Sequence, residues 1–112
     1  MKLIYHITKN KTWLKAKAQN IYDFCTLKSD GFIHASTSKQ YLEVANRIFK
    51  NETEDLVLLA IDENLVQQKI VYENLEGGAE QYPHIYGPLN LDAVIKVYEL
   101  KKNKRGIFAP LF

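Results

Sequence analysis

The hexapeptide Leu56-Val57-Leu58-Leu59-Ala60-Ile61 is a near-continuous apolar run in a chain of 112 residues. A short apolar run without polar alternation is typical of a strand that is buried on both faces. The polar residues Asp62-Glu63-Asn64 follow the run and end it. Residues 56–61 therefore predict a central strand, around which the rest of the domain packs.

The segment before this strand carries the clearest helical pattern of the chain. Its apolar residues recur on one broad helical face, and they are Tyr41, Leu42, Ala45, Ile48 and Phe49. A serine or threonine just before this segment is expected to cap the helix. Beyond the central strand, residues 69–73 and 93–100 predict strands. Residues 76–88, which contain Gly77-Gly78 and Pro83, predict a loop.

The first third of the chain predicts two more strands and one more helix. Residues 2–7 are rich in β-forming side chains, and residues 32–35 follow the turn-forming Ser29-Asp30-Gly31. Residues 11–19 show helical spacing of Trp13, Leu14 and Ala18, with Thr8 as the expected cap. The order strand, helix, strand, helix and then several strands predicts an α+β fold. In this fold, two main helices pack on a mostly antiparallel sheet.

Composition and charge restrict the class of protein. A chain of 112 residues, 46% hydrophobic and 25% charged, fits one globular domain, 1–112. The net charge of +2 and a single dense basic run at residues 101–105 do not favour nucleic-acid binding. Cys25 is the sole cysteine, and the chain has no long apolar stretch that would form a signal peptide or a membrane span. We therefore expect a cytoplasmic protein.

Three histidines, His6, His34 and His84, share one kind of setting. Each lies among apolar or aromatic residues, near the end of an expected element or in a loop. An imidazole can donate at one nitrogen and accept at the other, so the three predict a shared cleft for a small ligand. The alternative is that they are satisfied core residues. No histidine spacing or cysteine partner matches a metal-ligand motif, so we expect no metal.

Two further segments carry candidate chemistry, each with a simpler alternative. Ser36-Thr37-Ser38 offers hydroxyls and amides before a helix, which suits a phosphate, although helix capping explains them too. Residues 73–80 contain Glu73, Glu76 and Glu80 and lead to His84, so they offer a general base. Alternatively, this segment is an exposed loop. Four tyrosines lie close to the histidines in sequence: Tyr5, Tyr22, Tyr82 and Tyr86. Their rings can stack on both faces of a base, or they can belong to the core.

Three segments of the sequence form a recognisable set. They are residues 82–89, Tyr-Pro-His-Ile-Tyr-Gly-Pro-Leu, residues 5–7, Tyr-His-Ile, and residues 30–36, Asp-Gly-Phe-Ile-His-Ala-Ser. Through these segments, above all residues 82–89, the chain resembles a small bacterial family known as domain of unknown function 952, from Ile4 to about Val97. Ala35 stands where the family often has cysteine, which argues against an essential thiol there. That family has no settled activity, so the resemblance implies a fold more than a function.

Residues 5–8, Tyr-His-Ile-Thr, and residues 34–38, His-Ala-Ser-Thr-Ser, carry a second and looser similarity. They resemble the Tyr-His-Gly-Thr-like string and the strand end before a helix of the ADP-ribosyltransferase superfamily. This similarity implies a split antiparallel sheet and NAD as a possible substrate. His6 would bind the ribose, Ser36 or Thr37 would support the ring or phosphates, and Glu80 or His84 would polarise the ribose or activate an acceptor. No separate cofactor is implied.

The leading hypothesis is therefore a domain that binds an NAD-like, phosphate-bearing ligand, with possible transferase activity. The candidate catalytic residues are His6, His34, His84 and Glu80. The candidate ligand-binding residues are Tyr5, Thr8, Ser36, Thr37 and Tyr86. The alternatives are a non-catalytic binding module, which would not need Glu80, and a protein-interaction domain. For the latter, the basic then apolar tail, residues 101–112, either packs back on the domain or contacts another subunit.

Overall fold

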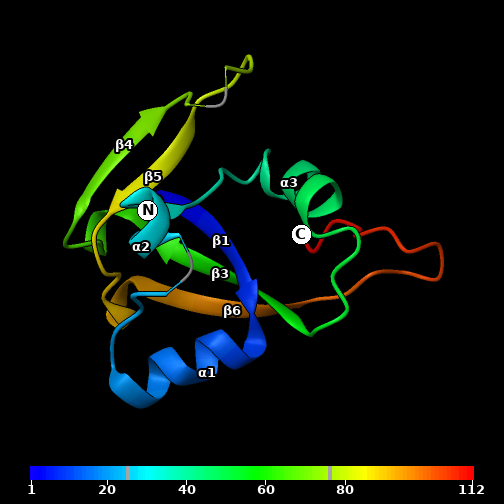
Figure 1. Ribbon diagram of the computed structural model, residues 1–112, viewed down its shortest axis with the longest axis horizontal. Coiled ribbons are helices and arrows are strands. Elements are labelled where there is room, and N and C mark those ends of the chain that lie inside the picture. Colours follow the sequence, from blue (N-terminus) through cyan, green and yellow to red (C-terminus); the bar gives the residue numbers. More distant parts are fainter. Residues whose placement is uncertain (25, 76) are drawn as a thin grey trace.

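The computed structural model describes residues 1–24, 26–75 and 77–112, and it forms two antiparallel three-stranded sheets (Figure 1). Cys25 and Glu76 lie outside the described residues. The first sheet has the order β1 (Leu3–Lys9), β3 (Leu56–Asp62), β6 (Val94–Leu100). The second has the order β2 (Ile33–His34), β5 (Tyr82–Tyr86), β4 (Lys69–Glu73). The α+β class is confirmed.

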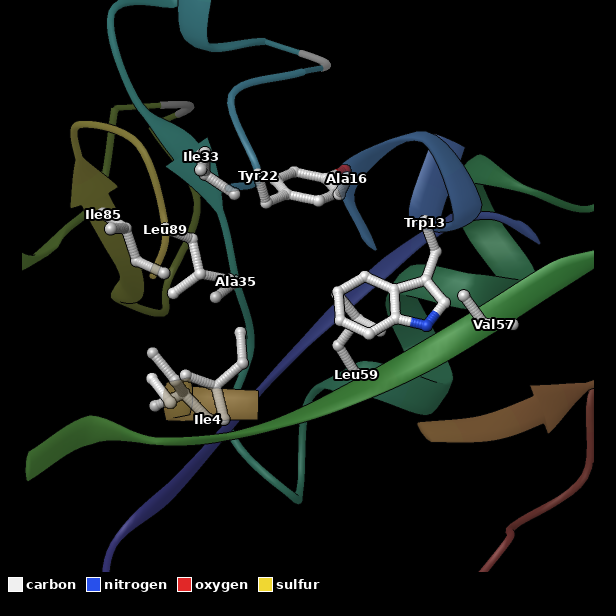
Figure 2. Close-up of a cluster of buried hydrophobic side chains, with 12 residues drawn as sticks. Ile4, Trp13, Ala16, Tyr22, Ile33, Ala35, Val57, Leu59, Ile85 and Leu89 are labelled. Carbon is white, nitrogen blue, oxygen red and sulfur yellow. The ribbon is translucent and has the colours of Figure 1, made fainter. Parts of the chain in front are cut away.

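The predicted central strand is confirmed as β3, which lies between β1 and β6 and is buried along its whole length. Its side chains alternate between two hydrophobic clusters. Val57 and Leu59 pack with Trp13 on one face (Figure 2), and Leu56 and Leu58 pack in the other cluster. Polar alternation is absent from residues 56–61 because both faces of the strand are covered.

Two of the helices cover these two faces (Figure 1). Helix α1 (Asn10–Gln19) supplies Trp13 and Ala16 to one cluster, and α3 (Tyr41–Ile48) supplies Tyr41 and Ala45 to the other. Both predicted helices are confirmed. The structure adds a one-turn helix, α2 (Leu27–Asp30), and two 3₁₀ helices, η1 (Glu63–Leu65) and η2 (Leu91–Ala93).

The predicted helix caps are wrong. Thr8 belongs to β1, and the N-cap of α1 is Lys9, without a side-chain cap bond. The N-cap of α3 is Gln40, again without such a bond. The hydroxyl of Thr8 is instead engaged in the interior, 2.8 Å from the Tyr22 hydroxyl. The Thr8 hydroxyl thus interacts with the buried Tyr22 hydroxyl rather than with the N-terminus of α1.

The predicted loop at residues 76–88 is also wrong in part, because residues 82–86 form strand β5 between β2 and β4. Pro83 cannot donate a hydrogen bond, which normally keeps proline out of central strands. Its C=O accepts from the Ala35 N–H, and in an antiparallel strand the N and O of one residue face the same neighbour. The missing N–H therefore falls on the side of β2, which has only two residues, and leaves pairing with β4 intact.

The two sheets are joined at a main-chain seam. The amides of Tyr5 and Ser36 each donate to the other residue's carbonyl, both at 2.7 Å. Tyr22 and Leu89 form a similar pair, at 2.9 and 2.8 Å. The seam brings the end of β2 beside β1, so the histidine-bearing strands of both sheets lie next to one another.

The C-terminal tail, residues 101–112, packs back on the domain (Figure 1). Phe108 is 2% exposed, and the side chain of Asn46 in α3 bonds both its N–H and its C=O. Lys102 donates to the carbonyls of Lys50 and Glu52. Of the two placements left open by the sequence, the structure shows the first. No helix in the described ranges has the length and apolar character needed to cross a membrane.

Candidate functional site

A cleft of about 600 Å³ opens between the two sheets and is flanked by α1 and α3. Strand β1 and the segment after β2 line it with His6, Thr8, Ser36 and their neighbours, and β5 adds Tyr82 and His84. The flanking helices contribute mostly long side chains, among them Lys11, Lys15, Arg47 and Ile48. Both sheets and both long helices therefore contribute side chains to the cleft.

The structure brings the three histidines together in this cleft. His34 and His84 are directly opposite in the β2–β5 ladder, and their ring centroids are 5.1 Å apart. His6 Nδ1 lies 2.5 Å from the His34 carbonyl, to which it donates. Residues separated by up to 78 positions thus meet because β5 pairs with β2 and the seam places β1 alongside.

His6 is held by the protein at both ring nitrogens. Its Nε2 lies 2.8 Å from the Tyr22 hydroxyl, which in turn lies 2.8 Å from the Thr8 hydroxyl. His6, Thr8 and Tyr22 are all buried. Because both of its ring nitrogens are engaged, the His6 side chain is held in place, and its bond to the His34 carbonyl fixes the main chain at His34.

Replacement of Tyr22 by phenylalanine is expected to lower the free energy of unfolding by about 1–3 kcal/mol, because buried groups of His6 and Thr8 lose a partner. Urea unfolding followed by circular dichroism measures the change. Tyr98→Phe is the matched control, since no hydrogen bond joins its hydroxyl to the described residues. It should change stability by roughly 0.5 kcal/mol or less. Equal losses in the two variants would contradict the role of the Tyr22 hydroxyl.

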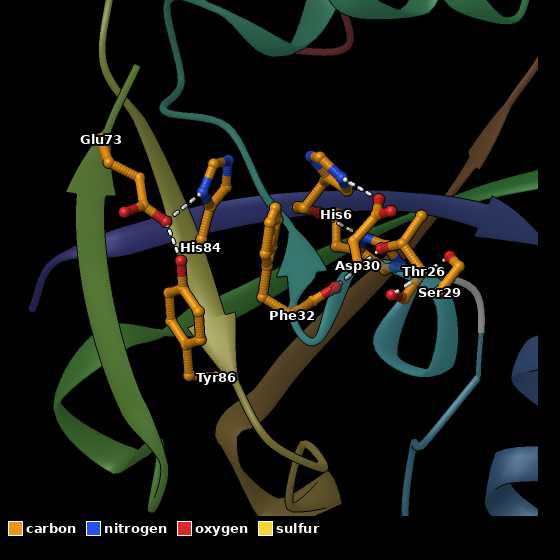
Figure 3. A network of polar contacts seen from close by, with 9 residues as sticks. His6, Thr26, Ser29, Asp30, Phe32, Glu73, His84 and Tyr86 are labelled. Carbon is orange, nitrogen blue, oxygen red and sulfur yellow. Dashed lines mark hydrogen bonds and ion pairs between the residues drawn. The ribbon is translucent and has the colours of Figure 1, made fainter. Parts of the chain in front are cut away.

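His84 is oriented by Glu73, one of the three carboxylates that the sequence offered in residues 73–80, and not by Glu80, which was the candidate catalytic residue. Glu73, in β4, lies with one oxygen 2.8 Å from His84 Nδ1, and the same oxygen accepts from the Tyr86 hydroxyl (Figure 3). These bonds, first from Tyr86 and then from His84, hold the pKa of Glu73 below its usual range. In return, Glu73 raises the pKa of Tyr86. Glu73 is therefore a carboxylate at neutral pH.

The remaining nitrogen of His84 is open to the cleft. The side chain is 4% exposed, and Nε2 has no hydrogen-bond partner among the described residues. No fully buried polar side-chain atom of those residues lacks a partner, so Nε2 touches the cleft space. Phe32 stacks on the ring, with centroids 4.1 Å apart and planes 9° from parallel (Figure 3). A fixed ring thus presents to the cleft one nitrogen that has no partner in residues 1–24, 26–75 and 77–112.

The lining of the cleft is mostly apolar, and the charged side chains within it are mostly basic. Lys9, Lys11, Lys15 and Arg47 line it, and Glu73 is the one acidic lining residue in the described part of the chain. Lys9 and Lys11 each lie 2.6 Å from Glu54, and hydrogen bonds from Lys11 and Lys9 lower the pKa of Glu54 to about 2. Sequence reasoning missed these cations. The available signal was the four-residue spacing of Lys11 and Lys15, which places them on one helical face.

Three predicted site residues do not line the cleft: Thr37, Glu80 and Tyr86. Glu80 is exposed and accepts from the Gln40 side chain at 3.3 Å. The Thr37 N–H donates to the same side chain, and the Ser36 N–H is used in the seam. The amides of Ser36 and Thr37 are therefore not available to a phosphate. Tyr5, Thr8 and Ser36 do line the cleft.

Fold and site together define a small α+β domain with a basic, histidine-lined cleft. The chain belongs to the DUF952 family, described as protein of unknown function, whose model matches residues 7–97. It is similar to protein CC0527 from Caulobacter crescentus, whose X-ray structure gives a TM-score of 0.83 at 32% identity and covers 96% of this chain and 93% of that one. The solution NMR structure of CC0527 gives 0.81 at 34% identity, with 99% and 93% covered. No curated protein matches the chain.

Proposed function

We propose that the cleft binds a phosphate-bearing small molecule of the nucleotide type, such as NAD. The observation that carries this proposal is the combination of four basic side chains with three histidines in one cavity. A volume of about 600 Å³ falls in the range of roughly 300–1,000 Å³ that small-molecule sites occupy. Tyr5, Phe24 and Tyr82 line the same cavity and offer faces on which a base can stack.

The basic residues and His84 Nε2 bind different groups of the ligand. Lys15 and Arg47 attract the phosphates, because a guanidinium and an ammonium pair well with phosphate oxygens. His84 Nε2 meets a ribose hydroxyl, since it is the imidazole nitrogen of His84 without a protein partner in the described residues. His6 does not contact the ribose in this arrangement. Its role is to hold the main chain of His34 through the hydrogen bond to the His34 carbonyl.

Charge reversal at Lys15 tests the binding proposal. Isothermal titration calorimetry with NAD, ADP-ribose and inorganic phosphate should show saturable binding of at least one of them. Lys15→Glu should raise its Kd by about tenfold or more, because the variant places a carboxylate where a phosphate is attracted. Lys104→Glu makes the same change outside the cleft and should leave Kd unchanged. Absence of binding by all three ligands, or equal effects of the two variants, would refute the proposal.

Beyond ligand binding, the more specific prediction is an ADP-ribosyltransferase-like reaction. The oxocarbenium-like centre of such a transfer needs a nearby negative charge. Glu80 is one candidate for this charge from the sequence, but among the described residues the carboxylate that lines the cleft belongs to Glu73. Release of nicotinamide from NAD by the wild-type protein would support transfer.

A non-catalytic binding module is the second candidate function. It is favoured by the position of Glu80 outside the cleft and by the bonds that already occupy Glu73. It predicts that NAD or ADP-ribose binds and is recovered unchanged. Chromatography of the ligand after prolonged incubation with the protein separates the two candidates.

A further inference from the structure

Two histidines of the cleft each have their own carboxylate partner. His84 Nδ1 lies 2.8 Å from Glu73 of β4, and His34 Nε2 lies 3.1 Å from Asp30 of α2. The two partners come from different elements, yet the two rings stand opposite one another in the β2–β5 ladder. A single ring with a carboxylate is common in folded proteins, but two facing pairs in one basic cleft call for a chemical explanation.

The carboxylates decide which nitrogen of each ring carries a hydrogen. A carboxylate only accepts, so His84 donates from Nδ1 and its neutral ring presents a lone pair at Nε2. An imidazole oriented in this way by a carboxylate is suited to act as a general base. His34 donates from Nε2 to Asp30, which leaves Nδ1 as its second nitrogen. Its side chain is 42% exposed, so solvent reaches the ring.

The distance between the rings suits one phosphate group. Their centroids are 5.1 Å apart, so a phosphate seated against both rings places different oxygens near each of them. Lys15 and Arg47 line the same cavity and can offset the charge that builds up on the phosphate oxygens. A transfer through an oxocarbenium centre gives no task to a second imidazole with its own carboxylate, whereas proton transfer at two oxygens of a phosphodiester uses both.

We propose that His84 and His34 act as general base and general acid in the cleavage of a ribonucleotide phosphodiester with a free neighbouring ribose hydroxyl. The proposal rests on the proposed function, since it needs the phosphate-bearing ligand to bind in this cleft. His84 Nε2 takes the hydroxyl proton, and the ribose oxygen forms a bond to phosphorus. The bond from phosphorus to the leaving oxygen breaks, and protonated His34 donates a proton to that oxygen. The products are a cyclic phosphate and an alcohol, and no oxidant or reductant is needed.

Glu73 and Asp30 are positioning residues in this scheme. Glu73 keeps the His84 lone pair directed into the cleft and stabilises the imidazolium that forms there. Asp30 holds the ring of His34 and balances its positive charge before the proton is given up. Phe32, stacked on His84, restricts the rotation of that ring.

Two substrates that differ only in their leaving group test the assignment. They are the para-nitrophenyl and methyl diesters of ribonucleoside 3′-phosphates, each tested with all four bases. Nitrophenolate leaves without a proton, whereas methoxide needs one. The wild-type protein should convert at least one base of each series to the cyclic phosphate. His84→Ala should lower kcat about 100-fold or more on both substrates, and His34→Ala should do so only on the methyl diester.

Controls separate chemistry from folding and from binding. Glu73→Gln should lower kcat with little change in KM, and Glu73→Asp should restore part of it, while Glu99→Gln makes the same change far from the cleft and should leave kcat unchanged. His84→Gln provides a second variant of smaller volume change if His84→Ala does not fold. No cleavage of any diester, or equal losses in His34→Ala on both leaving groups, would overturn the proposal. If calorimetry still shows nucleotide binding in that case, the proposed function stands without it.

Discussion

Replacing Leu59 by alanine is expected to lower the free energy of unfolding by about 2–5 kcal/mol. Leu59 lies in the middle of β3, has no exposed surface and belongs to the cluster that Trp13 closes (Figure 2). Neighbours on a central strand are held by ladders on both sides, so they cannot collapse into the cavity that the lost side chain leaves. Urea unfolding monitored by circular dichroism measures the loss. It is a large share of the roughly 5–15 kcal/mol that stabilises a typical domain.

Leu65→Ala is the matched control for this substitution. Leu65 is 49% exposed at the end of η1, outside both buried clusters. The same loss of side-chain atoms should there cost roughly 0.5 kcal/mol or less. A small effect at Leu59, comparable to that at Leu65, would show that β3 is not the packed centre of the fold.

Replacing Phe108 by alanine is expected to destabilise the domain by about 3–5 kcal/mol and to release the tail. The ring is 2% exposed and packs in the cluster that contains Tyr41, Leu58 and Leu100. Its main chain is bonded on both sides to Asn46 of α3, so loss of the ring also weakens that anchor. Differential scanning calorimetry should show a lower Tm, and limited proteolysis should cut within residues 101–112.

Phe112→Ala separates burial from aromatic stacking in the tail. Phe112 contacts the rings of Tyr5 and Tyr41, with centroids 5.2 and 5.1 Å away, but it remains 55% exposed. Its removal should cost about 1 kcal/mol or less. If Phe112→Ala were as damaging as Phe108→Ala, the tail would be held by stacking at its end rather than by the buried ring.

Local patterns predicted much of the fold because several elements carry their own signal. The apolar run at residues 56–61 and the helical face of residues 41–49 both appear where the sequence placed them. Strand β5 was missed because Pro83 and the preceding glycines are typical of loops. What makes residues 82–86 a strand is pairing with β2 and β4, which depends on residues far away in the chain.

The candidate site, like the fold, was predictable where local sequence patterns determine it and was not predictable where pairing between distant residues determines it. The apolar settings of His6, His34 and His84 predicted that they share a cleft, and the structure places all three there. The choice of carboxylate could not be made locally, because Glu73 and Glu80 both precede His84 in sequence. Register decides it, since β4 pairs Glu73 with Tyr82 and brings its carboxylate to His84, while Glu80 lies before the strand begins.

The seam between Tyr5 and Ser36 has a consequence for how this cleft can change. Both of its hydrogen bonds run between main-chain atoms, so replacing either side chain by any residue except proline leaves their donors and acceptors in place. The spacing between β1 and β2 is thus independent of the side chains at those positions, whereas the basic groups of Lys15 and Arg47 that line the cleft are side chains of the flanking helices. Under the proposed function, the side chains that select a ligand can therefore be exchanged without rebuilding the main-chain framework that sets the distance between β1 and β2.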